Sequence, residues 1–135
     1  MSRITEKIKE VEEFLEELEE VAVDNFEKYL KNIQKRLACE RAFEKIVEAT
    51  NDLAMVMIKE KRFPLPSEDI KAFDVLTDKK IIPTELGKKL KDAKGMRNFI
   101  IHQYGKINDE LVFEAVSENI VKDVEDFIKY IKKNI

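Results

Sequence analysis

The chain contains few residues of the kinds that break helices or carry covalent and metal chemistry. Its 135 residues include three glycines, three prolines, one cysteine, one histidine and no tryptophan. So few glycines and prolines favour helices over a turn-rich β fold. The single cysteine, Cys39, excludes an intrachain disulfide, and its apolar helical surroundings predict a buried, inert thiol. The single histidine excludes a di-iron bundle, which needs Glu-x-x-His pairs on two helices.

Long apolar runs and common catalytic motifs are also missing. No stretch of about twenty apolar residues and no secretory signal is present, so no membrane segment is expected and a cytoplasmic location is predicted. The chain has no glycine-rich phosphate loop and no Ser-His-Asp or Cys-His grouping. We therefore expect neither a metal nor a cofactor.

Charged residues make up 39% of the chain, and the apolar residues between them are spaced as in helices. From Ser2, a predicted N-cap, to about Glu20, apolar residues recur at alternate steps of four and three. Such a heptad stripe needs a partner helix, in the same bundle or in a second protomer. The stripe consists of Ile4, Ile8, Val11, Leu15, Leu18 and Ala22.

The remaining helices are predicted from caps and breaks. Asp24, Ser67 and Asn108 are expected to cap helices, Pro83 suits a first turn, and Gly105 suits a C-terminus. The expected class is all-α, an up-and-down bundle of four to five helices forming one domain over residues 1–135. The predicted helical ranges after the first are 24–30, 33–61, 67–76, 83–105 and 108–132.

Charge is unevenly distributed along a chain whose formal net charge is −3. Seven glutamates and no basic residue lie between Glu10 and Glu20. The segment from Leu86 to Lys106 holds five lysines and Arg97 against Asp92 alone. A basic segment in an acidic protein suits a local phosphate site, with Lys94 and Lys106 as candidate contacts to a nucleic-acid backbone. For any one of these lysines, a solvated helix face is the competing interpretation.

The basic segment contains the residues best suited to phosphate chemistry. Arg97, Asn98, His102 and Tyr104 lie within eight positions of one predicted helix. A guanidinium can clamp phosphate oxygens with two hydrogen bonds, and an imidazole can transfer protons near neutral pH. A tyrosine can position an oxygen or be modified itself. We therefore interpret this grouping as the candidate site.

Helical geometry limits how one copy of this segment can act. Arg97 and His102 are five residues apart, which separates them by about 140° around a straight helix. Either the last turn before Gly105 is distorted, or a second chain completes the site across a two-fold axis. Metal-free RNA cleavage commonly uses two histidines, one as base and one as acid. Because this chain has one histidine, a homodimer with a shared site is suggested.

The pattern R-x-x-x-x-H-x-Y, filled by Arg97, His102 and Tyr104, resembles the signature of the HEPN superfamily in its HepT-like branch of ribonuclease toxins. The resemblance extends over nearly the whole chain. It includes residues 40–46, residues 48–54, the Pro64 and Pro66 break, and residues 96–105 followed by a final helix.

The resemblance implies an all-helical homodimer in which Arg97 and His102 cut RNA without a metal. It also implies a partner, a minimal nucleotidyltransferase antitoxin of the MntA type, which neutralises the toxin by transferring AMP to Tyr104. The pair would form a type VII-like toxin–antitoxin system, and a larger hetero-oligomer with the antitoxin is left open. A charged nucleotide on Tyr104 would fill the cleft and repel the substrate phosphate.

Several assignments keep an alternative. Asn98 is predicted to hold a phosphate oxygen or to orient His102. Asp52 and Glu40 are candidates for orienting Arg97 or His102, although both residues would serve equally as structural ion-pair partners. The competing function is a non-catalytic module that binds a nucleotide or the nucleotidyltransferase. A purely structural adaptor would have Arg97 fully paired inside the protein.

Overall fold

The computed structural model describes residues 2–102 and 107–135, apart from the side chain of His102. Within these ranges every regular element is helical, which confirms the predicted all-α class. None of these helices is long and apolar enough to cross a bilayer. The elements are α1 (Arg3–Val21), α2 (Phe26–Lys31), α3 (Ile33–Glu60), the 3-10 helix η1 (Asp69–Lys71), α4 (Ala72–Asp78), α5 (Thr84–His102), α6 (Asp109–Glu114), the π-helical η2 (Ala115–Asn119) and α7 (Ile120–Lys133).

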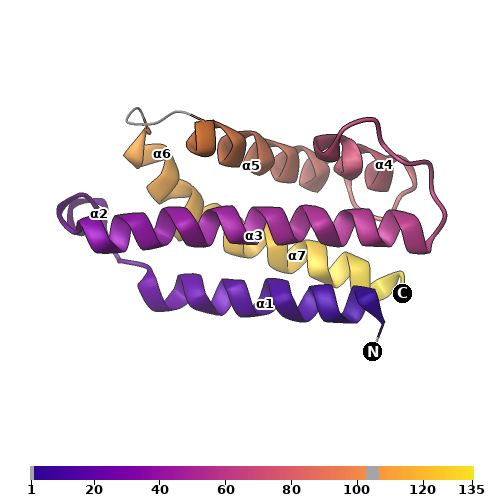
Figure 1. The fold of residues 1–135 in the computed structure, drawn as a ribbon, viewed down its shortest axis with the longest axis horizontal. Helices are drawn as coiled ribbons and strands as arrows, with labels where there is room; N and C mark the ends of the chain where they lie inside the picture. The colour runs from indigo at the N-terminus through magenta and orange to yellow at the C-terminus, as the bar shows by residue number, and fades with distance from the viewer. Residues whose placement is uncertain (1, 103–106) are drawn as a thin grey trace.

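The long helices run alternately in opposite directions along the molecule (Figure 1). The central helix α3 packs against α1, α4, α5 and α7, and α5 also packs against α7. Both termini lie at one end of the bundle, whereas α2, α6 and the last described turn of α5 lie at the other end (Figure 1). This is the predicted up-and-down bundle, and it places the end of α5 at the same end of the molecule as α2 and α6 (Figure 1).

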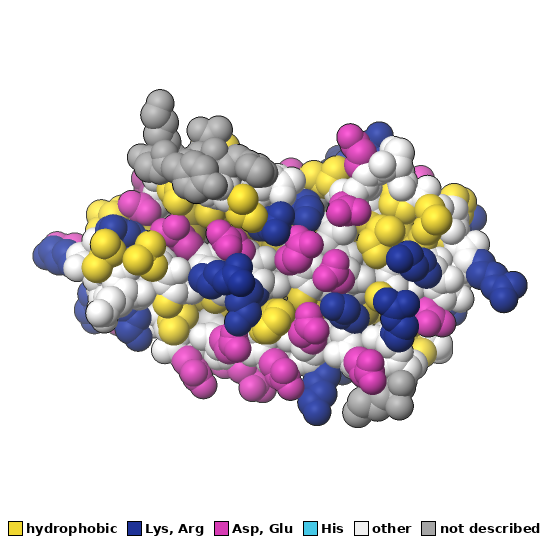
Figure 2. Space-filling view, viewed as in Figure 1, with side chains coloured by type: hydrophobic (Ala, Val, Ile, Leu, Met, Phe, Trp, Pro, Cys, Tyr) yellow, Lys and Arg dark blue, Asp and Glu magenta, His cyan; other side chains and the backbone are white. Residues whose placement is uncertain are grey.

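The apolar stripe of α1 finds its partner inside the same chain. Ile4, Ile8, Val11 and Leu18 are buried, and α1 packs mainly on α3. The glutamates of α1 occupy its outer face, where acidic side chains line the lower edge of Figure 2. Burying one face and solvating the other is the ordinary solution for an amphipathic helix in a bundle.

Two helix starts follow the predicted caps, and two differ. Ser2 and Asn108 cap α1 and α6 by accepting the backbone N–H of the residue three positions later. Asn25, not Asp24, caps α2 by accepting the Lys28 backbone N–H, and the Asp24 carboxylate is paired with the Lys28 side chain. Ser67 caps no helix: the chain forms η1 first, and Glu68 precedes it without a side-chain cap. The connector begins after Asp78 rather than after Leu76.

The predicted final helix is interrupted. Residues 115–119 form a π-helical segment between α6 and α7. Ser117 Oγ donates a hydrogen bond to the Phe113 carbonyl oxygen, which competes with the regular backbone pairing of that turn. A hydroxyl that bonds the preceding turn bends a helix locally, and hydrophobic periodicity does not register such a bend.

Two glycines of α5 should respond oppositely to alanine. A Cβ at Gly87 would overlap Thr77 Oγ1, which bonds the Phe73 carbonyl oxygen, whereas a Cβ at Gly95 would meet no atom within 4 Å. Gly87→Ala should lower the free energy of unfolding by about 1–3 kcal/mol through overpacking. Gly95→Ala should raise it by about 0.5–1 kcal/mol, since alanine loses less backbone entropy in a helix. Urea denaturation of both variants checks the pair; equal shifts would contradict the packing of α5 on α4.

Candidate functional site

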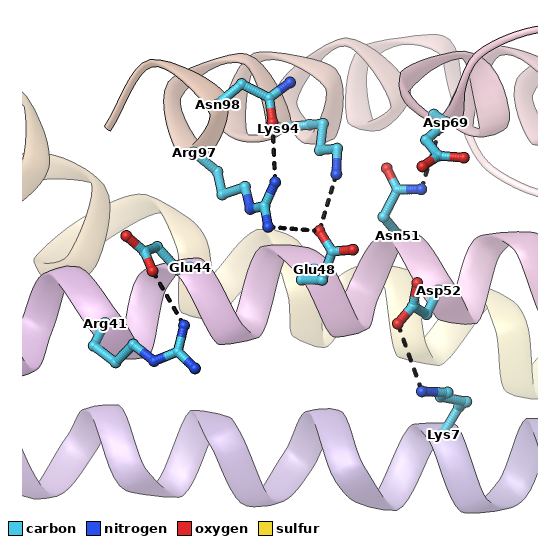
Figure 3. A network of polar contacts seen from close by, with 10 residues as sticks. All are labelled: Lys7, Arg41, Glu44, Glu48, Asn51, Asp52, Asp69, Lys94, Arg97 and Asn98. Carbon is cyan, nitrogen blue, oxygen red and sulfur yellow. Dashed lines mark hydrogen bonds and ion pairs between the residues drawn. The ribbon is translucent and has the colours of Figure 1, made fainter. Parts of the chain in front are cut away.

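The candidate site is built where α5 crosses α3. Lys94 and Arg97 are three residues apart on α5, so their side chains leave the helix on one side and reach α3 (Figure 3). Both side chains meet Glu48, which lies near the middle of α3. One carboxylate of the central helix therefore joins two cations of the motif helix.

The distances define a compact charge cluster. Glu48 Oε2 lies 3.0 Å from Lys94 Nζ and 3.2 Å from Arg97 Nη2. The Lys94 side chain is 7% exposed, that of Arg97 24% and that of Glu48 43%. The lysine is thus enclosed while the guanidinium reaches the surface, so a ligand could contact Arg97 without displacing Lys94.

Asn98 also holds the guanidinium. Arg97 Nη1 donates a hydrogen bond of 3.2 Å to Asn98 Oδ1 (Figure 3). Arg97 Nε is buried and finds no acceptor among the described residues. One hydrogen bond and one ion pair engage the two terminal nitrogens, and each of these nitrogens carries a second N–H that remains for an anion. Arg97 is therefore oriented without being saturated.

Neither of the two carboxylates predicted to orient Arg97 or His102 is the ion partner of Arg97. Asp52 Oδ2 lies 3.6 Å from Lys7 Nζ of α1, and burial raises the pKa of the Asp52 carboxyl although Lys7 lowers it. Glu40 is half-buried; burial and then the Asp109 carboxylate raise its pKa, while Arg36 lowers it. The carboxylate on Arg97 is Glu48, so the expected contact of Asp52 or Glu40 with Arg97 is replaced by one from Glu48. Their relation to His102 stays a prediction.

Sequence reasoning missed Glu48, although a signal for it exists. Glu44, Glu48 and Asp52 repeat every four residues along α3, so they share one side of that helix. Lys94 and Arg97 similarly share one side of α5. The pattern indicates two complementary helix faces, but it does not reveal which carboxylate lies opposite which cation.

The basic residues around the motif differ in exposure. Lys88 and Lys89 are exposed, whereas Lys91 Nζ lies 3.0 Å from Asp74 Oδ2 of α4. The side chain of Lys94, expected as a contact to the RNA backbone, is only 7% exposed and is bonded to Glu48. Burial and pairing place its amine away from the surface where such a contact would form. The predictions for Lys106 and Tyr104 lie outside the described residues, as does the side chain of His102.

Other candidate chemistries have little support in the described part of the chain. Cys39 is fully buried, its thiol faces the Val21 carbonyl oxygen, and burial raises its pKa. A thiol whose pKa is raised forms little of the nucleophilic thiolate. Among the described residues, no three or more His, Cys, Asp or Glu side chains are grouped so as to hold a metal ion.

The chain is similar to nucleases named HepT in two bacteria. It is 27% identical over 103 residues to the tRNA nuclease HepT of Aphanizomenon flos-aquae, which covers 76% of this chain and 68% of that protein. It is 28% identical over 89 residues to the mRNA nuclease HepT of Shewanella oneidensis, covering 66% of each protein. These identities are low but extend over most of the bundle.

Solved structures share the fold, and a family profile spans nearly the whole chain. The tri-AMPylated Shewanella oneidensis HEPN toxin, solved in complex with its MNT antitoxin, has a TM-score of 0.89 and 23% identity over 98% of this chain and 99% of that chain. YutE of Bacillus subtilis, a cytosolic protein of unknown function, has a TM-score of 0.79 and 21% identity over 96% and 89%. The profile described as ribonuclease HepT-like matches residues 4–131. The chain therefore belongs to the ribonuclease HepT-like family.

Proposed function

We propose that this chain is a metal-independent endoribonuclease toxin, neutralised when a nucleotidyltransferase antitoxin transfers AMP to Tyr104. The observation that carries the proposal is the state of Arg97. Its guanidinium is oriented by Glu48 and Asn98, its side chain is 24% exposed, and each terminal nitrogen keeps a second N–H beside the helix end that bears His102. Such a guanidinium suits the doubly charged oxygens of a phosphorane transition state.

The reaction follows from the groups in the motif. The ribose 2′-hydroxyl attacks the adjacent phosphorus while His102 accepts its proton, and the bond to the 5′-oxygen breaks. The products are a 2′,3′-cyclic phosphate and a 5′-hydroxyl, the latter protonated by the second copy of His102 in a dimer. Arg97 stabilises the added negative charge, and Asn98 keeps the guanidinium in place. One similar nuclease is named for tRNA and the other for mRNA. We therefore propose RNA as the substrate class and assign no particular type of RNA.

The same residues argue against a purely structural adaptor. That reading requires Arg97 to be fully paired within the protein. Its side chain is 24% exposed, and its Nε lacks an acceptor among the described residues. A non-catalytic binding module would use the same guanidinium. Only a measurement of RNA cleavage therefore distinguishes such a module from an enzyme.

The test is cleavage of a structured RNA by the purified protein in EDTA. Wild type should cut and leave cyclic phosphate ends, and His102→Ala should not. The preparation must be shown by intact mass to carry no AMP on Tyr104. Absence of cleavage by such unmodified wild type would favour the binding module, and cleavage retained by His102→Ala would place the chemistry elsewhere.

A homodimer fits the distribution of exposed apolar side chains. One end of the bundle carries large exposed hydrophobics on α2, the start of α3, the end of α5 and α6 (Figure 1); we call them the end patch. Hydrophobic side chains are visible at that end of the molecule in Figure 2. An apolar patch beside the motif suits a second copy of the chain, which would bring two motifs together. The end patch consists of Leu30, Ile33, Leu37, Phe99 and Leu111.

Charge placed in the end patch should separate the dimer. Ile33 and Leu37 are 59% and 57% exposed and four residues apart on α3, so both point to one side. Ile33→Glu/Leu37→Glu should turn a wild-type dimer into a folded monomer, because two carboxylates would be buried unpaired at the interface. Light scattering after gel filtration measures the mass. Leu65→Glu, at a side chain 67% exposed near the opposite end, is the control and should remain dimeric. A monomeric wild type at micromolar concentration would refute the shared site.

The partner we propose is a minimal nucleotidyltransferase that uses ATP, attaches AMP to the Tyr104 oxygen and releases pyrophosphate. The support is the similar HEPN toxin, which was solved tri-AMPylated and in complex with MNT antitoxin. The transferred phosphate adds negative charge beside Arg97, where an RNA phosphate would otherwise bind. Assembly of the dimer with several antitoxin copies belongs to the same proposal.

A further inference from the structure

Two cations of α5 converge on one oxygen of α3. Lys94 Nζ and Arg97 Nη2 both lie within 3.2 Å of Glu48 Oε2, as Figure 3 shows. Two positive charges and one negative charge leave a net charge of about +1 on the cluster at neutral pH. Because Lys94 is enclosed and Arg97 reaches the surface, the excess positive charge is available to a ligand at the guanidinium.

We infer that Lys94 is a positioning residue for Arg97: it offsets the charge of Glu48, so that Glu48 orients the guanidinium without neutralising it. The inference rests on the proposed function for its consequence in cleavage. Lys94 touches no substrate in this account. The positioning role replaces the predicted contact of Lys94 with the RNA backbone.

The burial of the three groups supports these separate roles. A buried ammonium keeps its charge only beside a counter-ion, and among the described residues Glu48 is the ion partner of Lys94. Glu48 is therefore retained by Lys94 even when a phosphate competes for Arg97. Without Lys94, the same carboxylate would pair with Arg97 alone and oppose an incoming phosphate.

The competing explanation is that the ion pair of Lys94 and Glu48 only stabilises the packing of α5 on α3. The two explanations differ for a variant that removes both charges. In Lys94→Met/Glu48→Gln no buried charge is left unpaired, and the amide oxygen of glutamine can still accept from Arg97. If Lys94 positions Arg97, the double variant should bind phosphate and cleave RNA better than Lys94→Met does. If the ion pair only stabilises the packing of α5 on α3, the loss of activity in each variant should follow its loss of stability.

Another ion pair on α5 serves as a matched control. Lys91 lies three residues before Lys94, and its Nζ is 3.0 Å from Asp74 Oδ2, the same separation as in the Lys94 pair. It joins α5 to α4 and involves no atom of Arg97. Lys91→Met, Asp74→Asn and their double variant should leave cleavage within about twofold, as expected for exposed pairs worth little energy.

The experiment measures anion binding and cleavage in parallel. Protein labelled with 15N-arginine is titrated with inorganic phosphate, and the Arg97 Nε–H resonance, assigned by its loss in Arg97→Lys, reports binding. Lys94→Met should weaken phosphate binding and lower kcat, each about tenfold, the size of a modest electrostatic coupling. Lys94→Met/Glu48→Gln should recover most of both. Thermal unfolding of every variant identifies effects of stability.

Each outcome decides the inference. Unchanged phosphate binding in a folded Lys94→Met protein would overturn it, and so would a double variant as impaired as Lys94→Met. Should the methionine variant not fold, Lys94→Gln gives the same comparison with a polar side chain. If wild type binds phosphate as described but never cleaves RNA, the proposed function fails and the positioning role of Lys94 stands.

Discussion

Replacing Arg97 with alanine should lower the kcat of RNA cleavage by about 10²–10³-fold, the usual effect of removing one preorganised transition-state donor. The guanidinium contacts Glu48 and Asn98 through its two terminal nitrogens, and each of these nitrogens carries a second N–H for a phosphate oxygen. Alanine removes the donors and leaves Glu48 with Lys94, so the cluster loses its excess positive charge. The change should fall mainly on kcat, because the charge that Arg97 stabilises develops during the reaction.

The variant Arg97→Lys distinguishes the effect of the positive charge at residue 97 from the effect of the planar guanidinium geometry. Lysine restores a positive charge but lacks the planar fork that bonds two phosphate oxygens, so it should recover only a small part of the activity. Lys88→Ala is the control, since Lys88 is exposed on the same helix. Steady-state cleavage rates in EDTA, with melting temperatures for each variant, provide the measurement. A stable Arg97→Ala protein that cuts at the wild-type rate would remove Arg97 from the mechanism.

The second large effect is expected at Tyr104. Tyr104→Phe should acquire no AMP from the proposed nucleotidyltransferase partner and ATP, because phenylalanine lacks the accepting oxygen. The variant should therefore continue to cleave RNA in the presence of the antitoxin, provided that neutralisation depends on the added charge and bulk of the nucleotide. Intact mass spectrometry measures the attached AMP, and the cleavage assay in EDTA measures the remaining activity of the same sample.

The other tyrosines provide the control. Tyr29 is fully buried, so its hydroxyl is not accessible to an enzyme, while Tyr130 on α7 is half-buried. Tyr130→Phe should be modified and neutralised like wild type. AMP found on Tyr104→Phe would assign the acceptor to another residue, and an unmodified variant that is nevertheless silenced would mean that the antitoxin inhibits by binding.

Local signals in the sequence were sufficient for most of the helices. A heptad stripe requires only the spacing of side chains along one helix, which is why α1 was predicted within a residue of its ends. A cap requires only a side chain within three residues of a free N–H, as at Ser2 and Asn108. The prediction failed at Ser67, where the chain forms a 3-10 helix before α4. It also failed at residues 115–119, where the Ser117 hydroxyl bonds the Phe113 carbonyl oxygen and competes with regular helical pairing.

The sequence by itself determined the all-helical class, the motif helix and the grouping of Arg97 with Asn98, because all three depend on contacts between near neighbours in the chain. Only the tertiary structure decided that Glu48, and not Asp52, faces Arg97, and that Lys94 is enclosed. One turn of α3 separates these two carboxylates. Which of them meets α5 depends on how the two helices pack together, and that packing is set by the whole core rather than by either helix alone.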